Sequence, residues 1–247
     1  MRNFTLLALI VLTFVSCEIP GGSGGITQNK KSIICLLDIS GSTKESNLST
    51  FLDNIADEVI SKMEDDTSVV ILAIDNGSQT AANPLFEIDM STINFVDESL
   101  PMTVRDKMAK IKKAEFLKEL IGKFKMQTIN NINERKAYAT HTDIFGSLNQ
   151  IKRYKGTTTK VMIFSDMLNY SETFNMERLV RQNKNLVNHI KNAPKVTCNG
   201  KVEIYISTGD NVNLGPKKFN AVKEFWETYL NQNAYSLVDY TSSKISI

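Results

Sequence analysis

A short polar segment at 38–42, with the sequence DISGS, has the residue types of a site for a hard divalent cation. It follows an apolar run and places the Asp38 carboxylate and the hydroxyls of Ser40 and Ser42 at alternate positions. Gly41 stands between the two serines, where it would permit a tight bend. All three donors are oxygen atoms, which suit Mg²⁺ or Mn²⁺ and not zinc or copper. With so few anionic ligands, such an ion keeps open positions for water or for an outside ligand.

Two later polar positions are notable, of which the carboxylate of Asp166 could join these donors. Thr142 lies just before an amphipathic stretch, and Asp166 closely follows an apolar run at 161–164. Ligands of α/β sheets bind beyond the carboxyl ends of the strands, so residues that follow different strands can share one site. His141 precedes Thr142, but a lone His beside hard oxygen donors is more often a loop residue than a ligand. Asp143 is suited to cap the helix that follows.

These residues, in this order, resemble the metal-ion-dependent adhesion site of the von Willebrand factor A domain. The resemblance implies that one ion is held by five side chains, those of Asp38, Ser40, Ser42, Thr142 and Asp166. In the family the Asp166 position acts mostly through water, and a carboxylate of a partner protein fills the remaining position on the ion. The resemblance therefore implies metal-dependent binding of a protein and no catalysis.

The match departs from the family pattern in two places. Met167 stands where the family usually has Gly, directly after the last metal-site Asp. The sequence between Asp38 and Thr142 is also longer than a compact member requires, and the excess falls within 90–135, which includes a long helical stretch. The five site residues are intact, so the extra length is expected to change the surrounding surface.

The rest of the chain alternates short apolar runs with amphipathic stretches, a pattern that predicts buried strands and helices in turn. Strands are expected at 32–37, 68–74, 161–164, 202–206 and 235–238, with a short edge strand within 85–95. Helices are expected at 48–63, 104–126, 144–151, 176–190 and 219–230. The sequence therefore predicts one α/β domain at 31–247, with a doubly wound, mostly parallel six-stranded sheet flanked by helices.

The first residues have the features of a targeting signal. Arg2 precedes an apolar run at 6–15, which is too short to span a bilayer and ends at Ser16 and Cys17. A small residue followed by Cys resembles a bacterial lipobox, so we expect a signal peptide at 1–16 and an acylated Cys17. A Gly- and Ser-rich tether at 17–30 follows. This predicts a protein held by lipid in a bacterial cell envelope, on either its periplasmic or its outer face. A plain secretory signal cut nearby is the alternative.

Composition excludes several other classes. The 29 basic and 27 acidic residues give a net charge of +2, too balanced for a nucleic-acid-binding protein. Three cysteines are too few for a disulfide scaffold. The helix expected at 104–126 is rich in lysine, and it is either an ordinary solvated helix or a surface for anionic lipid or an acidic partner.

Two other functions fit parts of the sequence. A magnesium-dependent phosphohydrolase of the haloacid dehalogenase type needs a second Asp at the position of Ser40, so this chain lacks the proton-handling group. A structural subunit of an envelope assembly would instead use the lysine-rich helix, through residues such as Lys110, Lys112 and Lys113.

Overall fold

The structure of the chain is a computed structural model. It describes residues 30–41, 43, 45–76, 78, 83–137, 139–154, 156, 158–196, 201–210 and 214–247. Several sequence-based expectations lie outside the described residues. These are the signal peptide at 1–16, the acylated Cys17, the tether at 17–30 apart from Lys30, and the metal ligand Ser42.

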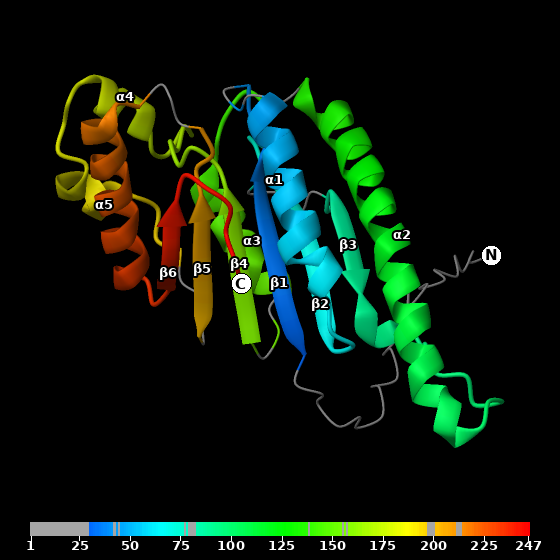
Figure 1. The fold of residues 1–247 in the computed structure, drawn as a ribbon. Coiled ribbons are helices and arrows are strands. Elements are labelled where there is room, and N and C mark those ends of the chain that lie inside the picture. The colour runs from blue at the N-terminus through cyan, green and yellow to red at the C-terminus, as the bar shows by residue number, and fades with distance from the viewer. Residues whose placement is uncertain are drawn as a thin grey trace, which may run out of the picture.

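Six strands form one sheet through the middle of the molecule (Figure 1). They are β1 (Lys31–Asp38), β2 (Thr67–Ile74), β3 (Phe86–Asp89), β4 (Thr158–Phe164), β5 (Val202–Ser207) and β6 (Ser236–Thr241). Their order is β3-β2-β1-β4-β5-β6, in which β2 and β3 pair antiparallel and the other neighbours pair parallel. This confirms the predicted fold class. The carboxyl ends of β1 and β4 lie side by side where the strand order reverses, which is the usual place for a ligand site.

The centre of the sheet is buried on both faces, as the unbroken apolar runs predict. In β1, Ile34 and Leu36 belong to the core on one face, and Cys35 and Leu37 belong to the core on the other. All four side chains are fully buried. Full burial of an aliphatic side chain, as at Ile34, Leu36 and Leu37, stabilises the fold by about 1.5–3 kcal/mol relative to an exposed one. The strand that ends at Asp38 is therefore among the most firmly held elements of the molecule.

Helices cover both faces of the sheet (Figure 1). They are α1 (Glu45–Glu58), α2 (Met102–Lys136), α3 (Ile144–Tyr154), α4 (Met176–Arg181) and α5 (Pro216–Gln232), with short 3₁₀ helices η1 (Ile60–Lys62), η2 (Met90–Thr92) and η3 (Val187–Asn192). The buried residues of α1 and α2 share one core, and those of α3, α4 and α5 share the other. None of the helices in the described ranges combines the length and the hydropathy that crossing a bilayer requires.

Three helices differ from the expectation. The helix expected at 48–63 ends at Glu58 and is followed by the separate 3₁₀ helix η1. The helix expected at 104–126 runs from Met102 to Lys136, because Thr128 and Ile132 continue the buried row at a spacing of four residues. The helix expected at 176–190 is interrupted: α4 ends at Arg181, and Asn183 adopts a left-handed conformation with φ of 53°. Asn tolerates this conformation better than most residues, and a helix cannot continue through it.

Candidate metal centre

Asp38 is the last residue of β1, and its side chain is fully buried. Its Oδ1 accepts a hydrogen bond from the Ser40 N–H at 2.9 Å, and its Oδ2 accepts one from the Ser165 hydroxyl at 2.7 Å. Burial raises the pKa of Asp38 above its ordinary value, and the hydrogen bonds from Ser40 and Ser165 limit that rise. The carboxyl group is thus fixed in orientation and weakly solvated, so a cation placed beside it would be strongly attracted.

Ser40 and Thr142 meet at the same end of the sheet, although 102 positions separate them in the sequence. The Thr142 hydroxyl donates to Ser40 Oγ at 2.9 Å, and both residues are buried. Two backbone hydrogen bonds fix Thr142 against Tyr170: the Thr142 N–H donates to the Tyr170 carbonyl at 3.0 Å, and the Tyr170 N–H donates back at 2.8 Å. Two of the predicted ligands are therefore in contact, each on a rigid backbone.

The bend after Asp38 forms without help from Gly41, contrary to the expectation from the sequence. The Thr43 N–H donates to the Ser40 carbonyl at 3.0 Å and closes the turn. Gly41 is not among the residues with positive φ, and a Cβ at this position would meet no atom of the described residues within 4 Å. An alanine would fit here, so the turn is set by its hydrogen bonds.

Asp166 lies just beyond the carboxyl end of β4, and β4 is the strand next to β1. It is half-buried, and its Oδ1 accepts a hydrogen bond from the Leu168 N–H at 2.9 Å. Burial raises the pKa of Asp166 to about 7, and the nearby negative charge of Asp38 adds to the rise. Of the five predicted ligands, Asp38, Ser40, Thr142 and Asp166 gather at this end of the sheet, and Ser42 is not described.

Met167, the departure from the family pattern, has a left-handed backbone with φ of 63°. Glycine adopts this conformation at no cost, whereas a residue with a side chain is strained by about 1 kcal/mol or more. Neighbours hold it in place: the Trp226 indole donates to the Met167 carbonyl at 2.8 Å, and the Met167 N–H donates to Ser165 Oγ at 3.0 Å. The Met167 side chain is itself fully buried in the core. Met167 thus keeps the backbone shape of a glycine position and adds core packing.

Reasoning from the sequence missed two residues that shape the site. Ser165 orients Asp38, and its place directly before Asp166 is the one signal that pointed to it. Asn169, fully buried, accepts a hydrogen bond from the Ile144 N–H at 2.9 Å and so joins the loop after β4 to the start of α3. The capping role expected for Asp143 is confirmed, because its Oδ1 accepts a hydrogen bond from the Gly146 N–H at 3.0 Å.

His141 lies at the rim of this site. Its ring stacks on Tyr170, with ring centroids 4.8 Å apart and an angle of 12° between the planes. Its Nδ1 is 2.9 Å from the Thr140 hydroxyl, within hydrogen-bonding distance. These contacts are those of a packed loop residue, and none of them directs the ring toward the hydroxyls of Ser40 and Thr142.

The donors fit a hard cation in type and in spacing. Mg²⁺ binds about six oxygens at about 2.0–2.1 Å, so adjacent ligand oxygens lie about 3 Å apart. The two hydroxyl oxygens of Ser40 and Thr142 are separated by 2.9 Å. Within the described residues, no group of three or more His, Cys, Asp and Glu side chains is placed to hold a metal ion. The proposed ligands are not such a group, because they combine only two carboxylates with neutral hydroxyls.

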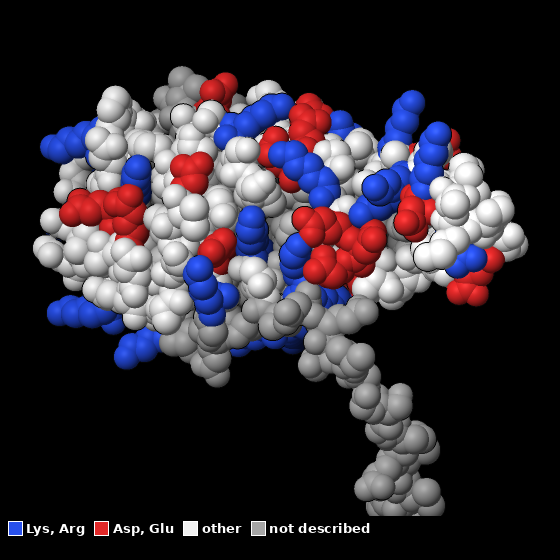
Figure 2. Space-filling model, turned by 60° about the horizontal axis from the view of Figure 1, so that its bottom comes forward, with Lys and Arg blue, Asp and Glu red and all other residues white. Residues whose placement is uncertain are grey.

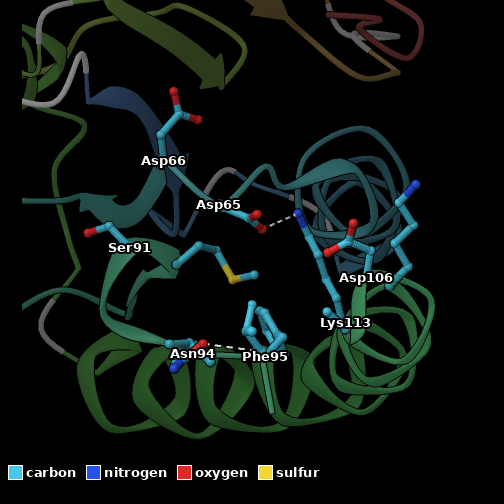
Figure 3. A pocket seen from close by; sticks show the side chains of 12 residues that line it. Asp65, Asp66, Ser91, Asn94, Phe95, Asp106 and Lys113 are labelled. Atoms are coloured by element: carbon cyan, nitrogen blue, oxygen red, sulfur yellow. Dashed lines mark hydrogen bonds and ion pairs between the residues drawn. The ribbon is translucent and has the colours of Figure 1, made fainter. Parts of the chain in front are cut away.

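A pocket with a volume of about 660 Å³ lies near the opposite, amino end of the sheet (Figure 3). Asp65 and Asp66 line it just before β2 begins, together with Phe95 and residues of α2. Lys113 from α2 points at Asp65, and their charged groups are 2.6 Å apart. The acidic side chain of Asp65 is thus matched by a cation of the protein.

No known protein-family model matches this chain, and no curated protein is detectably similar to it in sequence.

Proposed function

We propose that the carboxyl end of the sheet binds one Mg²⁺ or Mn²⁺ ion and that this ion engages a carboxylate of a partner protein. The motif resembles the von Willebrand factor A site, and the ligands would be the side chains of Asp38, Ser40, Ser42, Thr142 and Asp166. The chain would then act as a binding module and not as an enzyme. With the acylated Cys17 proposed from the lipobox, it would work at a membrane of a bacterial envelope.

The observation that carries this proposal is the 2.9 Å contact between the hydroxyls of Thr142 and Ser40. Residues so distant in the sequence need not meet, and their oxygens have the spacing of neighbouring ligands on one octahedral ion. The carboxyl groups support the same conclusion, because burial and the charge of Asp38 raise the pKa of Asp166. A divalent cation between the two carboxylates would remove this repulsion.

Each residue would have a distinct part in binding. Asp38 would supply the charge that holds the ion, with Ser165 and the Ser40 N–H fixing its two oxygens. Ser40 and Thr142 would contribute neutral oxygens, which leave most of the ion's positive charge uncompensated. The ion, when bound, therefore stays attractive to an acid from outside, and this is the chemistry it would supply.

Titration calorimetry with Mn²⁺ tests the proposal. The wild-type chain is expected to bind one ion, and Asp38→Ala and Thr142→Val are each expected to weaken binding by a factor of roughly 10–100 or more. Thr142→Val keeps the side-chain shape, so its loss of binding is not a loss of fold. Asp65→Asn is the matched control, because it removes a carboxylate at the other end of the sheet. Equal Mn²⁺ affinity in the wild type, Asp38→Ala and Thr142→Val would contradict the proposed site.

The partner step needs a second measurement. The wild-type chain is expected to retain an envelope protein in a pull-down with Mg²⁺, to lose it in chelator, and to lose it equally with Asp38→Ala. Retention of the same protein in chelator would show that another surface makes the contact.

A further inference from the structure

The helix α2 has one buried side, and no other element of the described residues covers its far side. Its buried residues are Leu117, Leu120, Phe124, Thr128 and Ile132. A second row of residues, three or four positions apart, follows the far side of the helix. We call this row the outer stripe, and it consists of Val104, Met108, Ile111, Glu115, Lys118, Gly122, Met126 and Ile129. All of its members are exposed.

The outer stripe is more apolar than a solvated helix face requires. Five of its members are exposed large hydrophobic side chains, from Met108 at 37% to Met126 at 62% exposed. They form two groups, one of Val104, Met108 and Ile111 and one of Met126 and Ile129. Single exposed hydrophobics are ordinary on a protein surface, whereas an aligned set on one helix face marks an interaction site.

Gly122 lies between the two groups, in the interior of a 35-residue helix. Glycine there costs about 1 kcal/mol of helix stability relative to alanine. Nothing within the chain requires it, because a Cβ at Gly122 would meet no atom within 4 Å among the described residues. A glycine with free space around it on an apolar face allows another backbone or a large side chain to approach closely.

The two polar members of the outer stripe, Glu115 and Lys118, lie at its centre. In the described part of the chain, neither forms an ion pair, whereas Lys112, Lys113 and Lys125 of the same helix are paired with acidic residues. Those acidic partners are Asp97, Asp65 and Asp53. Glu115 and Lys118 thus keep their charge available for a partner molecule.

We propose that the outer stripe is the interface of a homodimer in which α2 of a second copy lies antiparallel, about a two-fold axis between Glu115 and Lys118. Such an axis places Glu115 opposite Lys118 of the second copy and Lys118 opposite Glu115. It also places Ile111 opposite Gly122, Met108 opposite Met126 and Val104 opposite Ile129. Each of the two charged members of the outer stripe then meets its opposite, and a large side chain meets the glycine.

Self-complementarity of this kind is what a two-fold interface requires, because each contact occurs twice. A parallel pair would instead set Glu115 against Glu115 and leave the glycines facing each other. The stripe from Val104 to Ile129 measures about 39 Å at about 1.5 Å per residue, which is a long seam for a helix pair. The proposal is independent of the metal centre, because no member of the outer stripe is one of the proposed metal ligands.

A membrane surface fits these observations less well. Four lysines of α2 are already engaged in ion pairs within the chain, namely Lys112, Lys113, Lys125 and Lys136. Acidic and basic side chains alternate over the face shown in Figure 2, with no large area of basic charge alone. An anionic bilayer would favour such an area, whereas a second copy favours alternating charges.

Sedimentation velocity of the full chain tests this interface, with Cys17→Ser in all samples so that acylation contributes no association. As the concentration is raised to about 0.1 mM, dimers are expected to form. Their amount is expected to be the same with Mg²⁺ and with chelator. Glu115→Lys and Lys118→Glu are each expected to weaken the dimer by roughly tenfold or more, because like charges then face each other. The double variant Glu115→Lys/Lys118→Glu is expected to restore it.

Gly122→Leu gives a second readout that separates association from folding. It is expected to raise the thermal midpoint of the monomer, since leucine favours the helix, while abolishing the dimer. A monomer at all concentrations overturns the proposal, and so does a dimer that the single charge reversals leave unchanged. Failure of the double reversal to restore association overturns the two-fold register. Binding of the monomer to vesicles of equal phosphatidylglycerol and phosphatidylcholine, lost on Met108→Lys, would assign the stripe to a membrane instead.

Discussion

Acidic side chains gather at both ends of the sheet, and the two groups differ in what balances their charge. At the amino end, a hydrogen bond from Lys31 lowers the pKa of Glu64, and Lys113 lies 2.6 Å from Asp65. At the carboxyl end, burial raises the pKa of Asp38 and, together with the charge of Asp38, raises that of Asp166. The protein neutralises the first group with its own lysines. The second group, we propose, is neutralised by a metal ion from solution.

A third acid makes the comparison sharper, because it lies next to the proposed metal centre and has a cation of its own. Asp75 follows β2, is buried, and has its Oδ2 at 2.8 Å from Nη2 of Arg135. Arg135 belongs to the last turn of α2. The added length of α2, which the family pattern does not anticipate, thus brings a permanent positive charge to one carboxylate at this end of the sheet.

The largest effect is expected from removing that permanent charge. Arg135→Met leaves the Asp75 carboxylate buried without its cation, so the free energy of unfolding is expected to fall by about 3 kcal/mol or more. Urea denaturation at neutral pH measures this change. The double variant Arg135→Met/Asp75→Asn is expected to recover most of the loss, because no charge is then left buried. A loss in the single variant no larger than in the double variant would contradict this account of Asp75.

A smaller effect is expected from pH in metal-free protein. Because the pKa of folded Asp166, about 7, lies above its ordinary value of 3.8, the folded chain holds a proton that the unfolded chain has released. The free energy of unfolding is therefore expected to decline by about 2–3 kcal/mol between pH 5 and pH 8. Asp38, whose pKa burial also raises, adds to this decline, whereas carboxyl groups with a lowered pKa, such as Glu64 and Asp97, titrate mainly below this window.

Thermal unfolding in chelator at several pH values checks this prediction. Asp166→Asn is expected to abolish most of the decline, and saturating Mg²⁺ is expected to do the same in the wild type, because the ion neutralises the carboxylates. A decline of the same size in Asp166→Asn would assign it to other groups.

The smallest effect is expected at the amino end. Asp65→Asn breaks the ion pair with Lys113, but the Asp65 side chain is 79% exposed, so solvent and salt already screen the pair. We expect no measurable change in the free energy of unfolding or in Mn²⁺ affinity. A clear fall in the free energy of unfolding would contradict this expectation. It would mean that the exposed ion pair at the amino end contributes to stability as the buried acids at the carboxyl end do.

The comparison also explains what reasoning from the sequence could reach. Apolar runs such as those of β1 and β2 predicted buried strands, and the strand order places Asp38 and Asp166 at one end of the sheet. Ser40 and Thr142 followed from a motif whose spacing reflects this topology. Residues of this kind are predictable because each directly follows a strand or precedes a helix.

Other features depend on contacts between distant elements and could not be predicted from local patterns. Trp226 reads as one apolar position of an amphipathic helix, yet its indole N–H supports the strained backbone of Met167. Arg135 lies beyond the expected end of its helix at 126, and only the fold brings it to Asp75. The interruption at Asn183 was also missed, because apolar residues on either side of it keep a helical spacing.

The direction of β1 has a consequence for how the protein would be used at a surface. The chain enters this strand at Lys31 and leaves it at Asp38, seven residues later and about 23 Å away. If the proposed acyl group holds Cys17 in a bilayer, the fold is attached to the membrane on the side where the amino end of its central strand lies. The carboxyl end of β1, with its carboxylates and hydroxyls, would then face away from the membrane. An acidic loop of a neighbouring protein can reach it there.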